Sequence, residues 1–215
     1  MGGYISSRPE NPVKTHVELF PSSNCQVPAL PEPRYHHVSF VTEEGTVVTC
    51  GGRNQENHLR DCLALNVTRK RWQRGVIGNL DQARIYASAV TMPVGVFVLG
   101  GNWWKGRHWA IQESTEKKSL FLKLGSTDWI EGPALPIEHK YGCTLSISKT
   151  KFLMISGWNL REFDTSIGGP TSNAGWSPEN TFPELQDKRH GSYGCAKLGN
   201  KVTPYNVWWM IGFRC

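Results

Sequence analysis

Short apolar runs alternate with polar and turn-forming residues along the whole chain, and several of these runs lead directly into glycine. They lie at 47–50, 96–99, 152–155 and 207–211. Apolar runs of this length bounded by glycine are typical of buried β-strands. From Gly2 onward, the glycines at 51, 100, 157 and 212 follow one another at intervals of 49, 49, 57 and 55 residues. This spacing predicts a structural unit that is repeated along the chain.

Two further landmarks keep step with the glycines. Trp72 and Trp129 each lie 28 residues before a glycine that ends an apolar run. Trp176 precedes Gly212 by 36 residues, which indicates an insertion in that unit. A leucine, with proline beside it in two of three cases, precedes the next apolar run at 29–31, at 80 and at 133–136. The same order of landmarks therefore recurs from unit to unit.

The pattern predicts up to four strands in each unit. First strands are predicted at 35–41, 85–91, 141–147 and 193–198, and second strands at 46–51, 95–100, 151–156 and 207–212. Third strands are predicted near 17–20, 62–67, 119–124 and 161–167, and fourth strands near 72–74 and 129–131. The trailing pair of strands could join the leading pair in one sheet, which would hide both sheet edges.

The double glycine after a strand, the later tryptophan and the Leu-Pro linker together resemble the Kelch repeat, which has a period of about 50 residues. The resemblance covers residues 1–215 as a single domain, with repeats that start near Gly2, Gly51, Gly100 and Gly157 and a partial last unit that ends near Gly212. It implies an all-β fold class, a Kelch-type β-propeller whose blades are four-stranded antiparallel sheets.

The number of repeats bears on how such a propeller would close. Kelch propellers usually have about six or seven blades, so about four repeats indicate part of a larger or incomplete propeller. A closed ring of four blades is the alternative, and an open propeller could associate with further copies of the chain. In either arrangement we expect the glycines to lie at crowded strand ends and the tryptophans to pack between blades.

Composition and charge agree with this fold and limit the partners. The 22 glycines, 13 prolines and nine tryptophans fit many short strands joined by tight turns. The net charge is +6, but the densest basic stretch, at 69–74, is short enough to be a solvated turn, so no nucleic-acid partner is predicted. No apolar run reaches the roughly 18 residues of a membrane helix, and no secretory signal is visible at the start of the chain.

Tyrosine and histidine recur at the starts of the predicted first strands. They are His36, His37, Tyr86, Tyr141 and Tyr193. Galactose oxidase carries a copper site on a related propeller, but its set of ligands cannot be assembled here at a suitable spacing. We therefore expect these side chains to fill the mouth of the channel, and we predict no catalytic residue, metal or cofactor. A propeller enzyme of the oxidase or sugar-isomerase type, acting at the channel mouth, is the alternative.

The cysteines and one asparagine bear on the compartment. Cys50 ends a second strand and Cys62 opens a third, so they are predicted to form a disulfide if the protein is extracellular. Cys143 and Cys195 share the same position in their first strands and are predicted to be buried and free. Asn66 begins a glycosylation sequon at a predicted turn. These features favour an extracellular over a cytoplasmic location.

A long connection after the second predicted unit's second strand, from 102 to about 118, carries an aromatic and basic cluster. Its members are Trp103, Trp104, Lys105, Arg107, His108 and Trp109. These residue types are enriched at the centres of protein interfaces. The predicted function is therefore that of a non-catalytic binding scaffold, whose loops on one face contact another protein or a glycan. The alternative for the cluster is that its rings cover the end of a blade.

Replacing Trp104, Arg107 and Trp109 together with alanine should separate these two roles. If the cluster is a contact surface, partner binding is abolished while the melting temperature stays nearly unchanged. A large drop in the melting temperature would instead show that the rings belong to the core.

Overall fold

The computed structural model describes residues 28–104, 112–114, 117–156, 159–178, 193–198 and 201–206. These residues form an all-β fold of antiparallel sheets, and the one helical element among them is a short 3-10 turn, η1 (Asn173–Gly175). In this described part of the chain, no helix has the length and apolar character needed to cross a membrane.

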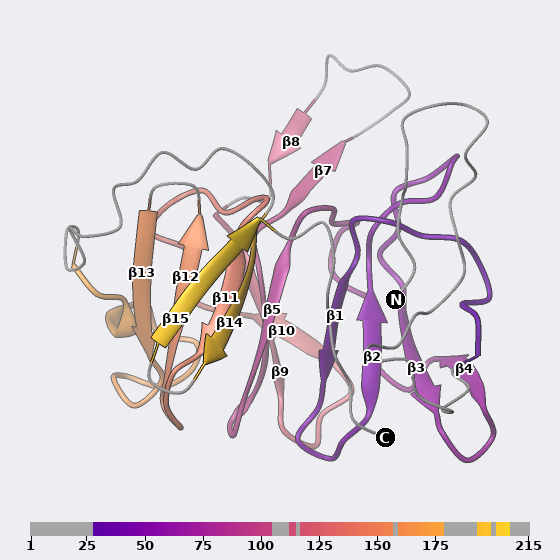
Figure 1. Ribbon diagram of the computed structural model, residues 1–215, viewed down its shortest axis with the longest axis horizontal. Helices are drawn as coiled ribbons and strands as arrows, with labels where there is room; N and C mark the ends of the chain where they lie inside the picture. Colours follow the sequence, from indigo (N-terminus) through magenta and orange to yellow (C-terminus); the bar gives the residue numbers. More distant parts are fainter. Residues whose placement is uncertain are drawn as a thin grey trace.

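The described residues form three sheets and two hairpins (Figure 1). The first sheet has the strand order β1 (Val38–Val41), β2 (Val47–Cys50), β3 (Cys62–Asn66) and β4 (Arg71–Arg74). The second sheet consists of β5 (Ser88–Met92), β6 (Gly95–Leu99), β9 (Ser119–Lys123) and β10 (Trp129–Glu131). The third sheet consists of β11 (Cys143–Ser146), β12 (Lys151–Ser156) and β13 (Asn159–Asp164). The hairpins are β7 (Asn102–Trp104) with β8 (Gln112–Ser114), and β14 (Tyr193–Leu198) with β15 (Lys201–Asn206).

The predicted strands of the first two units agree with these bounds to within three residues. Three other predictions are corrected. The third strand of the third sheet, β13, begins at Asn159, two residues before its predicted start at 161. The partner of β14 is β15 at Lys201–Asn206, whereas the predicted strand at 207–212 lies outside the described residues, as does the one at 17–20. The connection at 102–118 contains the β7–β8 hairpin, which the apolar pattern did not indicate.

The sheets pack face to face through side chains that alternate along each strand. Val96 and Val98 of β6 join a core with the first sheet, whereas Phe97 and Leu99 of the same strand join a core with the third sheet. Because side chains in a strand point alternately to opposite faces, a sheet buried on both faces is apolar at every position. The first strands lie next to one another in the order β1, β5, β11 and β14. Within the described residues this series of sheets is not found to close into a barrel or propeller.

The tryptophans of the outer strands are partly buried, and Trp129 packs between sheets, as expected. Trp129 of β10 contacts Phe40 of the first sheet edge to face, with ring centroids 6.0 Å apart. Its indole Nε1 donates a hydrogen bond to the carbonyl of Gly78, at 3.0 Å. Trp72 of β4 makes the equivalent bond to the carbonyl of Pro28, at 2.9 Å. Each tryptophan thus ties the outer strand of its sheet to the segment that leads into the same sheet.

The double glycines form the junctions between consecutive sheets. The N–H of Gly52 donates to the carbonyl of Arg84 at 2.7 Å, and the N–H of Gly101 donates to the carbonyl of His139 at 2.8 Å. Gly100 has φ +62°, and a Cβ atom there would lie only 2.0 Å from the His139 carbonyl oxygen. Only glycine combines this backbone conformation with so close an approach. The predicted crowding at the strand ends is confirmed.

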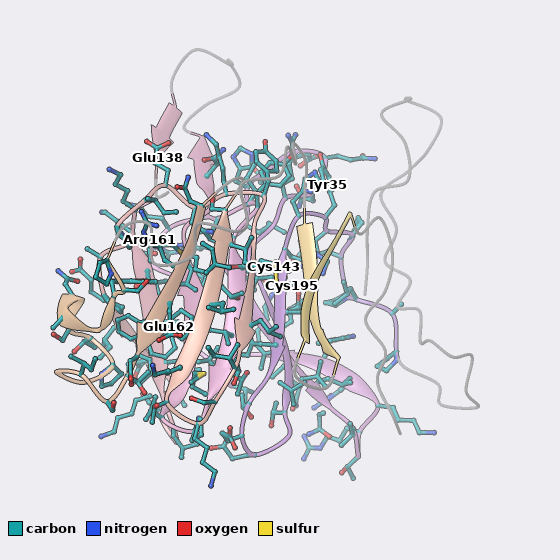
Figure 2. The ribbon with its side chains drawn as sticks, turned by 60° about the vertical axis from the view of Figure 1, so that its left-hand side comes forward. Tyr35, Glu138, Cys143, Arg161, Glu162 and Cys195 are labelled. Atoms are coloured by element: carbon teal, nitrogen blue, oxygen red, sulfur yellow. A yellow bond between two sulfur atoms is a disulfide. The ribbon has the colours of Figure 1, made fainter. Side chains whose placement is uncertain are left out.

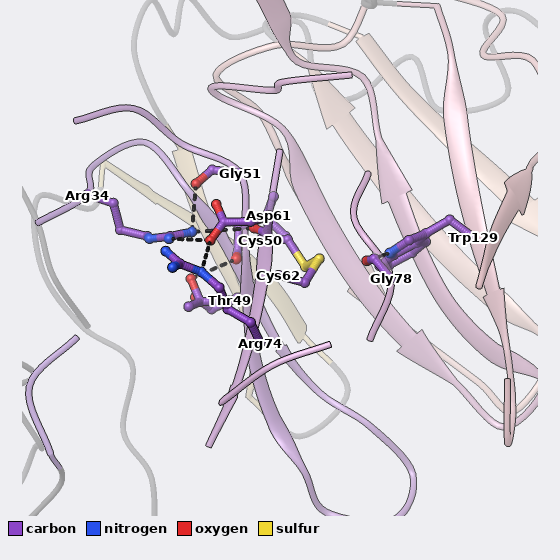
Figure 3. The surroundings of a disulfide bond; sticks show 11 residues. Arg34, Thr49, Cys50, Gly51, Asp61, Cys62, Arg74, Gly78 and Trp129 are labelled. Atoms are coloured by element: carbon purple, nitrogen blue, oxygen red, sulfur yellow. Dashed lines mark hydrogen bonds and ion pairs between the residues drawn. A yellow bond between two sulfur atoms is a disulfide. The ribbon is translucent and has the colours of Figure 1, made fainter. Parts of the chain in front are cut away.

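Two of these units each contain a buried arginine side chain that binds backbone carbonyl groups. The Arg34 side chain is fully buried and contacts the carbonyl oxygens of Gly51 and Asp61, as well as the Asp61 carboxylate at 3.0 Å (Figure 3). Arg84 is equally buried and donates to the carbonyl of Gly100 at 2.8 Å, with Asp81 as its ion-pair partner. A guanidinium group has five N–H donors, so it can satisfy several carbonyl groups that would otherwise be buried without partners.

His139 takes the place of the arginine in the third unit. It is fully buried, and its Nε2 atom lies 2.6 Å from the hydroxyl of Ser88, which begins β5. Burial lowers the pKa of His139 to about 4. The imidazole is therefore neutral at pH 7 and links the second and third sheets through a hydrogen bond rather than through charge.

The described region has two disulfides, one between a second and a third strand and one between two first strands. Cys50 and Cys62 are directly opposite in β2 and β3, with Cα atoms 4.1 Å apart, and are joined by a disulfide (Figure 3). Cys143 and Cys195 also form a disulfide, with Cα atoms 5.9 Å apart, so the prediction that they are free is wrong. Their shared position in neighbouring first strands, which suggested two equivalent buried thiols, is what brings them together.

Replacing Gly100 with alanine should destabilise the fold much more than replacing Gly125. Both glycines have positive φ, but a Cβ at Gly125 meets nothing within 4 Å. Gly125→Ala should cost about 1 kcal/mol for the backbone conformation alone. Gly100→Ala should cost about 3 kcal/mol or more, because the junction with His139 must also open. Urea denaturation of both variants measures the difference, and equal losses would contradict the role given to the junction.

Acid should weaken the protein partly through His139. The folded pKa of about 4 lies below the usual value of 6.5, so the unfolded chain binds the extra proton first. The contribution of neutral His139 to the free energy of unfolding is thus complete above pH 6.5 and is lost as the pH falls toward 4. His139→Gln, which keeps a polar partner for Ser88, should reduce the loss of unfolding free energy between pH 7 and pH 5 by about 2 kcal/mol. If the free energy of unfolding falls equally with pH in the variant and the parent, this assignment is contradicted.

Candidate functional site

Three ring-bearing residues occupy the same place in three successive units. His36, Tyr86 and Tyr141 each lie two residues before a first strand, and their φ angles are 56°, 60° and 56°. This left-handed backbone conformation is rare for residues other than glycine and costs about 1–2 kcal/mol each. We call these three residues the aromatic column.

The rings of the column contact one another in tilted pairs, with interplanar angles of 44° and 40°. The centroids of His36 and Tyr86 are 4.1 Å apart, and those of Tyr86 and Tyr141 are 4.0 Å apart. The backbone follows the same order, because the N–H of Tyr86 donates to the carbonyl of His36 at 3.1 Å and that of Tyr141 to the carbonyl of Tyr86 at 3.2 Å. The column therefore runs across the ends of three neighbouring first strands and is fixed by both side chains and backbone.

The turn before each first strand explains the unusual backbone. Ile85 pairs with Asn102, at the base of the β7–β8 hairpin, through two backbone hydrogen bonds, while the carbonyl of the preceding Arg84 accepts a hydrogen bond from Gly52, which follows the first sheet's β2. The chain must then change direction within one residue to enter β5, and Tyr86 makes this change. Backbone strain of this kind persists only where the surrounding structure holds it, and it is concentrated at functional sites.

A further aromatic ring, that of Tyr35, and a cation, Arg53, adjoin the column. The ring of Tyr35 contacts His36 edge to face, with centroids 4.8 Å apart, and the guanidinium carbon of Arg53 lies 5.4 Å from the Tyr35 centroid. Arg53 follows the first double glycine, and its backbone pairs with that of Tyr35. The rings and Arg53 are half-buried, so each presents part of its surface to solvent. This set offers ring faces, hydroxyl and imidazole groups and one positive charge.

The titration behaviour of the column suits binding better than proton transfer. Burial, reinforced by the nearby Arg53, lowers the pKa of His36 to about 4. Burial and the adjacent Tyr141 raise the pKa of Tyr86 above its usual value. Near neutral pH both groups are thus uncharged, and neither has the pKa close to the working pH that an efficient general acid or base needs. They can stack and hydrogen-bond, but they are poorly suited to moving protons.

The neighbouring His37 differs from His36. Burial and then the charge of Arg34 lower the pKa of His37 to about 3, and its Cβ lies against Gly52. It belongs to the packing of the double-glycine junction. Tyr193, the remaining residue of the predicted set, begins β14, and its side chain lies outside the described part of the structure. The structure therefore brings together three of the five predicted residues.

The predicted contact cluster rises from the same end of the sheets as the column. The base of the β7–β8 hairpin is Asn102, which pairs with Ile85 beside Tyr86, and the hairpin projects beyond the sheets (Figure 1). Tyr35 lies at this same end in Figure 2. Trp103 and Trp104 belong to β7, but their side chains are outside the described structure, as are Lys105, Arg107, His108 and Trp109. Their role as a contact surface stays a prediction.

Asn66, the predicted glycosylation site, is the last residue of β3 and is half-buried. Its side-chain Nδ2 donates to the side-chain Oε1 of Gln73 at 3.1 Å, and its side-chain Oδ1 accepts from the backbone N–H of Arg69 at 2.8 Å. These bonds shape the turn between β3 and β4. Attachment of a glycan would need the bond to Gln73 to break, so the modification stays a prediction.

Sequence reasoning missed Tyr35 and Arg53 as neighbours of the column. The available signal was positional, since Arg53 directly follows a double glycine and Tyr35 directly precedes His36. In the described residues, no group of three or more His, Cys, Asp or Glu side chains is placed to hold a metal ion. The described site is thus a surface of rings and one cation.

Comparison with known proteins adds no relative. A scan against models of protein families finds none that matches this chain, and a search of curated proteins finds no match either. Functional inference for this chain therefore rests on its own residues.

Proposed function

We propose that the chain is a Kelch-type β-propeller, whole or part of a longer array, that binds another protein or a glycan without turnover. Its binding face comprises the aromatic column, Tyr35, Arg53 and the β7–β8 hairpin. The propeller assignment is supported by sheets that repeat the same junctions: a double glycine, a buried basic side chain and a tryptophan bonded to the entering segment. The order of the first strands, each beside the next, also supports it.

The observation that carries the binding function is the column itself. Glycine would adopt the left-handed conformation at no steric cost, yet all three units have a ring at this position. The ring centroids lie 4.0–4.1 Å apart, and the rings remain partly exposed at one end of the sheets. Aromatic rings with a polar tip and an adjacent guanidinium group are the residue types on which interfaces most depend.

The low pKa of His36 and the high pKa of Tyr86 favour binding over the enzymatic alternative. An oxidase or isomerase would need a metal group or a group that gains and loses a proton near neutral pH. Nothing in the described residues favours that second function.

Replacing column residues with glycine tests the proposal directly. In the variant His36→Gly/Tyr86→Gly the backbone strain is relieved while the rings are lost, so the net loss of stability should stay within about 2 kcal/mol. Partner binding should be lost. The measurement is affinity capture with the immobilised intact chain, followed by quantitative mass spectrometry of retained proteins, together with a glycan array.

The matched control is Val67→Ser. Val67 is 72% exposed on the turn between β3 and β4, at the end of the first sheet remote from the column. Ligands that the parent and this control retain, but that the glycine variant loses at equal folding, support the proposal. An identical set retained by all three proteins contradicts it.

A further inference from the structure

The Cys143–Cys195 disulfide joins two elements that no backbone ladder connects among the described strands. β14 pairs only with β15 there, and this hairpin forms a sheet separate from the third sheet, although β14 lies beside β11 (Figure 2). Cys143 begins β11, and Cys195 lies in β14. An isolated two-stranded hairpin is at best marginally stable in water, so its attachment to the third sheet matters for its order.

The Cys50–Cys62 disulfide is different in both respects. It connects β2 and β3, which are already hydrogen-bonded neighbours in one sheet. Both of its residues are almost fully buried, at 0% and 1% exposure. Breaking it would separate no elements, and a reductant can hardly reach it. Cys195 is half-buried instead, so the second disulfide is less shielded than the first.

We propose that Cys143–Cys195 is a reducible clamp that holds the β14–β15 hairpin against the third sheet. A dithiol reductant opens it in two exchanges. One thiolate of the dithiol attacks the sulfur of Cys195, and Cys143 leaves as a thiolate that takes up a proton. The second thiol then attacks the mixed disulfide and releases Cys195 as a thiol. The dithiol ends as a disulfide, having supplied the two electrons and two protons that the cysteines gain.

Opening the clamp changes the surroundings of the aromatic column. Tyr193 precedes Cys195 by two residues, as Tyr141 precedes Cys143, so the start of β14 and the column lie at corresponding ends of neighbouring first strands. Release of β14 uncovers the side of β11 next to Tyr141. Reduction would thus alter the face that binds the partner, a consequence that rests on the proposed function, whereas the clamp itself does not.

Differential alkylation of the intact chain tests the clamp. The protein is treated under native conditions with graded dithiothreitol, trapped with N-ethylmaleimide and analysed by peptide mass spectrometry. Cys143 and Cys195 should be labelled at least about tenfold faster than Cys50 and Cys62, because the latter pair reacts only when its sheet opens. Equal or faster labelling of Cys50 and Cys62 would overturn the proposal.

Hydrogen exchange shows what the clamp holds. After selective reduction, peptides spanning 193–206 should lose protection by about tenfold or more while those spanning β2, β3, β5 and β6 keep it. The variant Cys143→Ser/Cys195→Ser should show the same pattern without reductant, and Cys50→Ser/Cys62→Ser should leave the hairpin protected. Full protection of 193–206 after complete labelling of Cys143 and Cys195 would refute the clamp. Lost protection with unchanged capture of ligands would refute only its link to the binding face.

Discussion

The contact on which this fold depends is the hydrogen bond from the second glycine of each pair to the buried carbonyl of the next unit. Gly52 reaches Arg84 in this way, and Gly101 reaches His139. The bond brings the end of one second strand against the entry to the next sheet, at a distance that leaves no room for a side chain. Flat apolar faces alone would allow neighbouring sheets to slide, whereas this directional bond sets their offset. The alternating cores on either side of β6 then interlock at that offset.

The aromatic column follows from the same junction. The residue after Arg84 pairs with Asn102 at the base of the β7–β8 hairpin, and the carbonyl of Arg84 accepts a hydrogen bond from Gly52, so the chain turns toward β5 at the next residue, Tyr86. Its left-handed conformation is imposed by the scaffold, and the ring attached to it projects at one end of the sheets. Since the junction recurs with each unit, the rings fall within stacking distance of one another. The proposed binding surface thus follows from the recurrence of this position in successive units.

The features of the structure that are predictable from the sequence are those set by short-range forces. The strands of the first two sheets and the crowding at Gly100 were predictable, because apolar runs and glycine conformations leave local signals in the chain. The Cys143–Cys195 disulfide was not, since it depends on how closely two first strands approach, which no single-strand pattern encodes. The β7–β8 hairpin was missed for a related reason: its polar and aromatic sequence lacks the alternation of a half-buried strand. Similarly, the matching positions of His36, Tyr86 and Tyr141 could be read from the sequence. Their ring contacts could not, because these depend on the offset between the sheets.

The third unit differs from the first two in the sequence at its double-glycine position and in having a disulfide between first strands. There the chain has Gly157 followed by Trp158, so the second glycine that donates to the next unit in the two preceding junctions is replaced by the largest side chain. At this junction the structure has a disulfide between neighbouring first strands, which the two preceding junctions lack among the described residues. A covalent bond joins the neighbouring first strands β11 and β14. Unlike a backbone hydrogen bond, however, it depends on the redox state of the surroundings, and so the attachment of this one hairpin becomes conditional while the other sheets stay joined.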